Sequence, residues 1–149
     1  MAEIEGEILI GRSVEDVFDF VADQRNEPQY NPRMVRAAKI TDGPVGKGTV
    51  FRSATKSMGR TAEMSIEVTG YDRPVRMASR TTMRQAGIDG TLTFVPAPSG
   101  TLMHWAWHVR PKGAVRLLAP LITWMGRRQE QAIWTSMKRY LENTARPGR

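Results

Sequence analysis

The feature that most limits how this chain can fold is a change in its hydrophobic period near residue 112. Before that point, apolar and polar residues alternate in short runs, at 3–10, 33–41, 49–55, 61–71, 77–83, 90–95 and 101–109. After it, apolar residues recur about every 3.6 positions as far as Leu141. Alternation indicates strands with one buried face, and the longer period indicates an amphipathic helix. The sequence therefore predicts about seven strands followed by one long C-terminal helix.

Turn-forming segments separate most of these runs and determine how the strands pair. Glycine and proline are concentrated at 42–48 and 96–100. Strands joined by such turns pair antiparallel, because parallel neighbours need a long crossover connection. A sheet of this kind must cover its apolar face, and the C-terminal helix carries the large apolar stripe that remains. We therefore expect an α+β fold, in which a curved antiparallel sheet wraps around the C-terminal helix.

The segment after the first strand has a different pattern. Ser13 can cap a helix with an apolar stripe at Val14, Val17, Phe18 and Val21. Because this stripe ends before Pro28, one or two short helices are expected here. In the C-terminal helix, we expect Pro120 to produce a bend. Residues 1–145 are interpreted as a single domain, and residues 146–149 as a frayed tail.

Composition and charge exclude several functional classes. The 149 residues contain no cysteine, which excludes disulfides and cysteine nucleophiles. No apolar stretch reaches the roughly 20 residues of a transmembrane helix. The formal charge is +7, but no recognition element accompanies it, so a specific nucleic acid partner is not expected. The acidic N-terminus is unlike a signal peptide, which favours a cytoplasmic location. The sequence leaves a homodimer open.

The two histidines do not form a metal site. His104 and His108 lie on a predicted strand, where a spacing of four residues places them about 13 Å apart. This separation is too large for one shared ion. By alternation they face away from Trp105 and Trp107, which we expect to face the long helix. We therefore expect no metal, no cofactor and no catalytic motif.

Several segments, in their order and spacing, resemble those of a known superfamily. They are 8–20, 28–32, 41–49, 94–96 with 99–101, and 137–142. Together they resemble the helix-grip fold of the START-like or SRPBCC superfamily, in its polyketide cyclase/dehydrase and lipid-transport branch. The similarity covers nearly the whole chain. One departure is Tyr30, where such proteins more often carry tryptophan.

The resemblance implies an apolar cavity between the sheet and the long helix. On the residues alone, an apolar strand face is ordinary core, although nine methionines and four tryptophans suit a pocket for irregular apolar guests. The candidate ligand-binding residues are Tyr30, Phe51, Met64, Ile66, Phe94, Met103, Trp105, Trp107, Leu121 and Met125. Candidate polar contacts are Thr55, Tyr71, Ser79 or Arg80, and Arg128.

Three functions remain open at this point. The first is the binding or carriage of a small hydrophobic or amphipathic molecule, lipid-like or polyketide-like. The second is an enzyme of the polyketide cyclase or dehydratase type that uses the same cavity. The third is an interaction protein without a ligand, whose basic surface docks an acidic partner or a membrane face. Titratable groups converging inside the cavity would favour the enzyme, an apolar cavity would favour carriage, and a filled core would favour the third. The sequence itself reveals no inward-facing acid and base pair.

Overall fold

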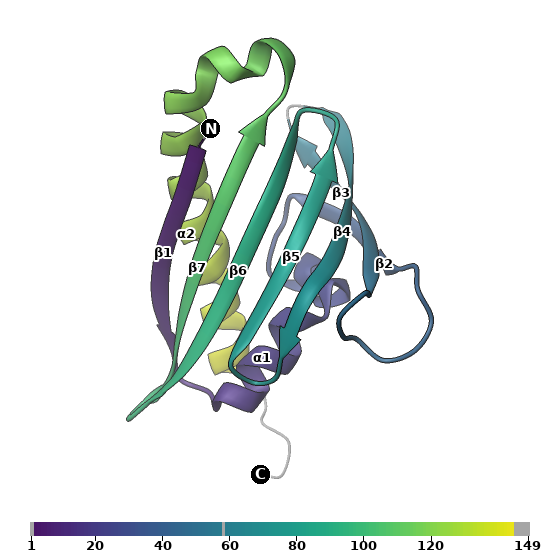
Figure 1. Cartoon of the computed structure of the whole chain (residues 1–149). Coiled ribbons are helices and arrows are strands. Elements are labelled where there is room, and N and C mark those ends of the chain that lie inside the picture. Colours follow the sequence, from purple (N-terminus) through teal and green to yellow (C-terminus); the bar gives the residue numbers. More distant parts are fainter. Residues whose placement is uncertain (1, 58, 145–149) are drawn as a thin grey trace.

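Seven strands form one antiparallel sheet in the computed structural model, which describes residues 2–57 and 59–144 (Figure 1). The strand order is β1-β7-β6-β5-β4-β3-β2. The strands are β1 (Ala2–Ile10), β2 (Met34–Lys39), β3 (Val50–Ser57), β4 (Arg60–Asp72), β5 (Arg76–Met83), β6 (Ala86–Ala97) and β7 (Gly100–Pro111). Strands β2 to β7 pair with their neighbours in the chain, and β1 pairs with β7. The α+β expectation and the antiparallel pairing are confirmed.

Two short helices connect β1 to β2, as expected. Helix α1 (Val14–Ala22) begins after Ser13, whose Oγ accepts a hydrogen bond from the Asp16 N–H at 3.2 Å. Val17, Phe18 and Val21 of its apolar stripe are buried, and the ring of Phe18 meets the ring of Phe94 edge-on, with centroids 5.1 Å apart. The 3₁₀ helix η1 (Gln24–Gln29) follows directly. Helix α1 lies at the lower end of the sheet in Figure 1.

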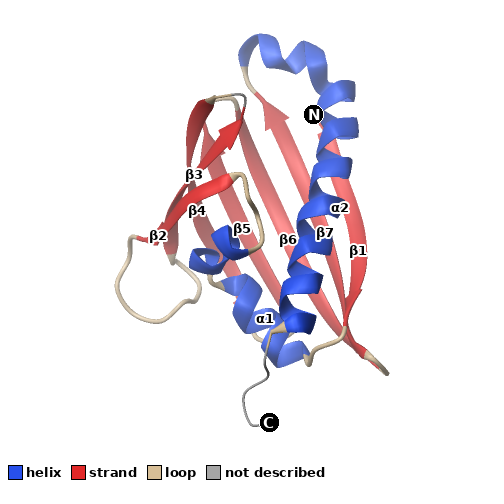
Figure 2. Ribbon diagram, turned by 180° about the vertical axis from the view of Figure 1, so that it is seen from behind, coloured by secondary structure: helices blue, strands red, loops and turns tan. Residues whose placement is uncertain are grey.

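The C-terminal helix α2 (Ala119–Asn143) lies across the inner face of the sheet (Figure 2). The expectation of a bend at Pro120 is wrong. The α-helix begins at Ala119, so Pro120 lies in its first turn. Proline fits that position, where its missing N–H leaves no hydrogen bond unmade. The preceding residues form a separate 3₁₀ helix, η2 (Gly113–Leu118). No helix among residues 2–57 and 59–144 is both long and apolar enough to cross a membrane. The tail expected at 146–149 lies outside the described residues.

The C-terminal end of α2 is held by the loop that follows β1. The Arg12 guanidinium donates a buried hydrogen bond of 2.7 Å from Nη1 to the Leu141 carbonyl oxygen. The Gly11 N–H donates to Oε2 of Glu142, also at 2.7 Å. The Thr101 hydroxyl in turn donates to the Arg12 carbonyl oxygen at 2.8 Å. These contacts fix the last turns of α2 against β1 and β7.

The register predicted for β7 is confirmed. Trp105 is 1% exposed and faces α2, where its ring centroid lies 6.0 Å from that of Trp134. His104 and His108 lie on the opposite face, 3.3 Å from the carboxylate of Glu5 and 3.5 Å from that of Glu3. Alternation along the strand therefore separates the inner aromatic face from an outer charged face.

Candidate functional site

A cavity of about 210 Å³ lies between the inner face of the sheet and α2. Most of its wall is apolar and comes from the seven strands and from α2, while η1 contributes polar residues. The apolar lining residues are Ile4, Met34, Met64, Ile66, Met77, Met83, Ile88, Leu92, Trp107, Val109, Ile133 and Trp134. The polar lining residues are Gln24, Glu27, Asn31, Thr55, Ser79, Thr81, Gln129 and Glu130.

The cavity exists because small side chains occupy inner-face positions in this part of the sheet. Thr55 lines it from β3, and Ser79 and Thr81 line it from β5. Gly90 pairs with Trp107 across β6 and β7, and the Trp107 ring lies directly over it. A Cβ atom at Gly90 would come within 1.9 Å of that ring. The absence of a side chain at Gly90 therefore allows Trp107 to lie flat and form one wall.

Two carboxyl groups face this cavity from different helices. Glu27 belongs to η1 and Glu130 to α2. Burial raises the pKa of Glu27 to about 8, the nearby Glu130 carboxylate adds to this increase, and a hydrogen bond with Asn31 opposes it. Burial likewise raises the pKa of Glu130 to about 7. Near neutral pH the pair therefore keeps a proton that ordinary glutamates, with a pKa of 4.5, would have lost.

Indole groups surround the Glu130 carboxyl. Trp107 and Trp134 direct N–H groups toward it, which stabilises the carboxylate and partly opposes the increase in its pKa. Neither N–H has a partner at hydrogen-bond distance within the described residues, and both atoms are buried. A buried donor without a partner is costly. The cavity wall thus presents donors that a water molecule or a polar ligand group can satisfy.

The structure separates the candidate ligand-binding residues into four groups. Met64, Ile66 and Trp107 line the cavity. Tyr30 is buried with its ring 6.1 Å from that of Trp134, and it does not line the cavity. Leu121 and Met125 are exposed on the outer side of α2, away from the cavity. The others fill the core near α1, namely Phe51, Phe94, Met103 and Trp105. A role of any of them in binding stays a prediction.

The candidate polar contacts are divided in the same way. Thr55 and Ser79 line the cavity. Tyr71 instead packs on Phe18, with ring centroids 5.2 Å apart. Arg80 lies on the outer face, 3.2 Å from Asp89. Arg128 lies on the outer side of α2, over the ring of Trp124.

The sequence interpretation missed both carboxyl groups. Glu130 carried a signal, because it shares the helical stripe of Gly126, Ile133 and Met137, and an acid within an apolar stripe is unusual. Glu27 carried no comparable signal, since the irregular segment 24–29 has no periodic apolar pattern. The inward-facing pair of Glu27 and Glu130 is therefore seen in the structure and was not predicted from the sequence.

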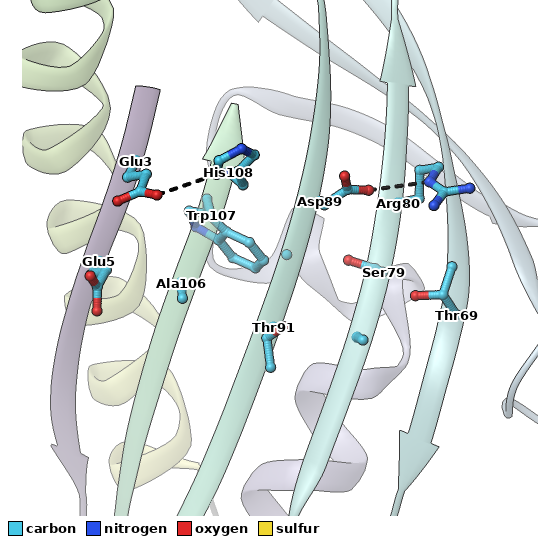
Figure 3. Close-up of a pocket in the computed structure, with 12 residues that line it drawn as sticks. Glu3, Glu5, Thr69, Ser79, Arg80, Asp89, Thr91, Ala106, Trp107 and His108 are labelled. Carbon is cyan, nitrogen blue, oxygen red and sulfur yellow. Dashed lines mark hydrogen bonds and ion pairs between the residues drawn. The ribbon is translucent and has the colours of Figure 1, made fainter. Parts of the chain in front are cut away.

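A second hollow, of about 490 Å³, lies on the outer face of the sheet (Figure 3). Its charged residues are all paired: Glu3 with His108, Asp89 with Arg80 and with Arg110 outside the lining, and Glu5 with His104. The hydrogen bond from Arg110 lowers the pKa of Asp89. These charges already have partners and lie on an open surface. A ligand bound there would therefore gain little interaction energy over water. We therefore take the inner cavity as the candidate site.

The residues that the structure describes contain no group of three or more histidine, aspartate or glutamate side chains that could hold a metal ion. Glu27 and Glu130 are two carboxyl groups among aromatic and aliphatic neighbours. Their environment favours retention of a proton. The chemistry available to the cavity is therefore hydrogen bonding and proton transfer.

Comparisons with known proteins support this architecture. A START superfamily protein from Mycobacterium smegmatis has 15% sequence identity and a TM-score of 0.82, with 95% of this chain and 98% of that chain covered. TTHA0849 from Thermus thermophilus has 16% identity and a TM-score of 0.77, with 95% and 99% covered. The di-domain ARO/CYC StfQ, from the steffimycin biosynthetic pathway, has 12% identity and a TM-score of 0.73, with 95% and 50% covered.

At these identities the solved structures establish the fold alone. None of the curated proteins is similar enough to this chain to match. The family model described as polyketide cyclase / dehydrase and lipid transport matches residues 1–142, nearly the whole chain. This match agrees with the helix-grip topology and with the cavity between sheet and helix. The chain therefore belongs to the polyketide cyclase/dehydrase and lipid transport family.

Proposed function

We propose that this protein binds or carries a small hydrophobic or amphipathic molecule in the cavity between the sheet and α2. The observation that carries the proposal is a largely apolar cavity that is also lined by two partly buried carboxyl groups, those of Glu27 and Glu130. Apolar walls with a few polar groups for orientation are the usual composition of a small-molecule site. This cavity favours carriage over a ligand-free interaction protein, because an interaction protein without a ligand would have a filled core.

The size of the cavity limits the ligand. Its volume of about 210 Å³ is below the roughly 300–1,000 Å³ of typical ligand pockets. A compact guest fits best, or the end of a longer amphipathic molecule. A polar group on that guest would lie beside Glu27 and Glu130, where the unpartnered indole N–H groups also point. The ligand class we favour is therefore apolar with one hydroxyl, carbonyl or similar group.

Binding can be tested by displacement of an environment-sensitive apolar dye from purified protein, with fatty acids, sterols and aromatic polyketides as competitors. The blocking variant is Thr81→Leu, which adds volume at the cavity wall. The matched control is Thr61→Leu, at an exposed position of β4. We expect Thr81→Leu to lower affinity at least tenfold and Thr61→Leu to leave it unchanged. Equal affinity in both variants would remove the cavity as the binding site.

A cyclase or dehydratase-type enzyme is the second candidate, and the carboxyl pair specifically favours it. With a pKa of about 8 and about 7, one group can donate a proton while the other accepts one. In a dehydration, the carboxylate would take a proton from the carbon beside a carbonyl. The freed electron pair would form the C=C bond as the C–O bond breaks, and the acid would protonate the departing hydroxyl to give water.

Carriage and catalysis can be distinguished with one pair of variants. A β-hydroxy ketone that binds wild-type protein should be incubated with it and analysed by mass spectrometry for loss of water. If the protein is an enzyme, Glu130→Gln and Glu27→Gln should each abolish the conversion while binding changes less than about tenfold. If wild-type protein releases every bound compound unchanged, the carrier proposal stands and the enzyme is excluded for that substrate class.

A further inference from the structure

An exposed apolar cluster lies at the end of the molecule where η2 joins α2. We call it the apolar tip, and it consists of Leu117, Leu118, Leu121, Trp124 and Met125. Leu117 is 86% exposed and Trp124 is 57% exposed. Five large apolar side chains within nine residues are each about half exposed or more, and such exposed apolar clusters mark interaction surfaces. The cavity does not account for this cluster, because none of its members lines the cavity.

Helix geometry directs the apolar tip away from the sheet. Leu121, Trp124 and Met125 are spaced three and four residues apart, so they share one face of α2. The opposite face meets the sheet at Gly126, where a Cβ atom would lie 2.3 Å from the Ile4 side chain. Figure 2 shows η2 and the first turns of α2 projecting beyond the strands at one end of the molecule. The apolar tip is therefore free to contact another surface.

A group of positive charges flanks the apolar tip. We call it the basic collar, and it consists of Lys112, Arg116, Arg127 and Arg128. Within residues 2–57 and 59–144, none of these four side chains forms an ion pair with a carboxylate. No acidic residue occurs between Asp89 and Glu130 in the sequence. The Arg128 guanidinium lies 5.1 Å from the centroid of the Trp124 ring, which joins the collar to the tip.

We propose that this end of the molecule docks on an anionic lipid surface. The apolar tip enters the boundary between headgroups and acyl chains, and the basic collar contacts the lipid phosphates. Leucine and tryptophan beside arginine is the composition expected for interfacial binding. Charge complementarity favours lipid over a second copy, because two tips in contact would bring together two basic collars whose side chains have no carboxylate partner within the described residues.

The position of the apolar tip relates docking to the cavity, although docking does not depend on what the cavity binds. Glu130 lines the cavity five residues after Met125 on the same helix. At about 1.5 Å of rise per residue, this corresponds to roughly 8 Å along the axis of α2. A docked molecule therefore holds its cavity close to the lipid surface.

Vesicle co-sedimentation tests the proposal directly. The probes are vesicles of 70% phosphatidylcholine with 30% phosphatidylglycerol, and vesicles of phosphatidylcholine alone. We expect wild-type protein to bind the anionic vesicles at least tenfold more tightly, with a blue shift of tryptophan emission. The double variant Leu121→Ser/Met125→Ser should lose at least tenfold in affinity. The matched control is Val35→Ser/Val95→Ser, which removes two exposed apolar side chains elsewhere and should leave binding unchanged.

The contribution of the basic collar is tested separately. Arg127→Ala/Arg128→Ala should weaken anionic vesicle binding on the order of 10- to 30-fold, at about fivefold for each arginine near the surface. The control Arg52→Ala/Arg60→Ala removes two exposed arginines elsewhere and should have little effect. Circular dichroism should show that all four double variants are folded, as expected for exposed positions.

Three results would overturn the proposal. The first is equal binding of wild-type protein to both kinds of vesicle, or binding to neither. The second is unchanged anionic vesicle binding in the tip variant. The third is a wild-type dimer in sedimentation velocity that Leu121→Ser/Met125→Ser converts to monomer, which would assign the apolar tip to a second copy of this chain.

Discussion

The inner face of the sheet is filled near α1 and hollow near η2, although the same strands form both halves. In the filled half, Phe51, Phe94 and Met103 are almost completely buried, in one core cluster with Phe18 of α1 and Met137 of α2. In the hollow half, the corresponding inner positions carry Thr55, Ser79, Thr81 and Gly90, and the cavity opens beside them. The two halves therefore differ in the volume of the side chains at their inner positions.

This comparison shows how one fold separates stability from binding. At the end near α1, packed aromatic rings and the hydrogen bonds from Arg12 and Gly11 stabilise the fold. The other end places two carboxyl groups among apolar side chains, which costs stability. We expect variants in the two halves to differ accordingly.

The largest contrast should come from truncating a large apolar side chain in each half. Phe94→Ala should lower the free energy of unfolding by about 3–5 kcal/mol, because it creates a new void in close-packed surroundings. Met64→Ala should cost clearly less, because this side chain already borders empty space. Urea unfolding monitored by circular dichroism measures both. Equal losses would contradict the division into filled and hollow halves.

The carboxyl pair predicts an unusual pH dependence of stability. The folded pKa values of about 8 and about 7 lie above the ordinary 4.5, so the folded state binds more protons than the unfolded state between pH 4.5 and 8. Stability from this pair is therefore fully present below pH 4.5 and is lost as the pH rises toward 8. The loss should be on the order of a few kcal/mol.

The control for this prediction is the double variant Glu27→Gln/Glu130→Gln. It should reduce the decrease in stability between pH 5 and 8, as measured by urea unfolding at each pH. A substitution at an exposed site, Glu67→Gln, should leave the decrease in place. A decrease that persists unchanged in the double variant would mean that other groups cause it.

Adding volume should follow the same pattern as removing it, with the larger loss of stability in the filled half. Met103→Trp inserts a larger side chain into a position with no exposed surface and should cost at least the roughly 1–3 kcal/mol typical of overpacking. Met64→Trp should cost less because the cavity can receive the ring, and it should reduce uptake of an apolar dye. Thermal unfolding and dye titration provide the two measurements. If Met64→Trp destabilises as strongly as Met103→Trp, the cavity is too small or too rigid to accept the ring.

The outer face should be the least sensitive region. His104→Ala and Glu5→Ala each break an exposed pair, and pairs of this kind contribute about 0–1 kcal/mol. Neither variant should change ligand or dye binding by more than the experimental error. A large loss of binding in either one would instead point to the outer hollow as the site.

Most of the fold could be predicted because its determinants are periodic. Residues 61–71 alternate so regularly that the buried positions Ile66 and Val68 follow directly from the sequence. The change of period at residue 112 likewise identified the long helix, with its C-terminal residues Met137 and Leu141 on the buried face. The start of α2 was harder to predict, since an apolar 3₁₀ segment and an apolar helix look alike over six residues.

The cavity could not be predicted from the sequence as well as the fold could. Alternation identifies which residues face inward, but it does not reveal whether the opposing surfaces meet, and Met64 and Met103 share this pattern with opposite outcomes. Leu121 and Met125 continue the apolar pattern of α2 but face solvent, because they lie on the face of α2 opposite Gly126, which packs against Ile4 of the sheet. Glu27 reaches the cavity through the path of η1, which no periodic pattern specifies.

The contacts between Arg12 and Leu141 and between Gly11 and Glu142 have a consequence for how the protein forms during synthesis. They join residues 129 and 131 positions apart, so nearly the entire chain must leave the ribosome before they can form. Until then, the nascent sheet exposes its apolar inner face without its cover. Non-local closure of this kind slows folding and prolongs the interval in which the chain can aggregate. Shortening the chain from the end of α2 should therefore reduce soluble yield sharply once Leu141 is removed.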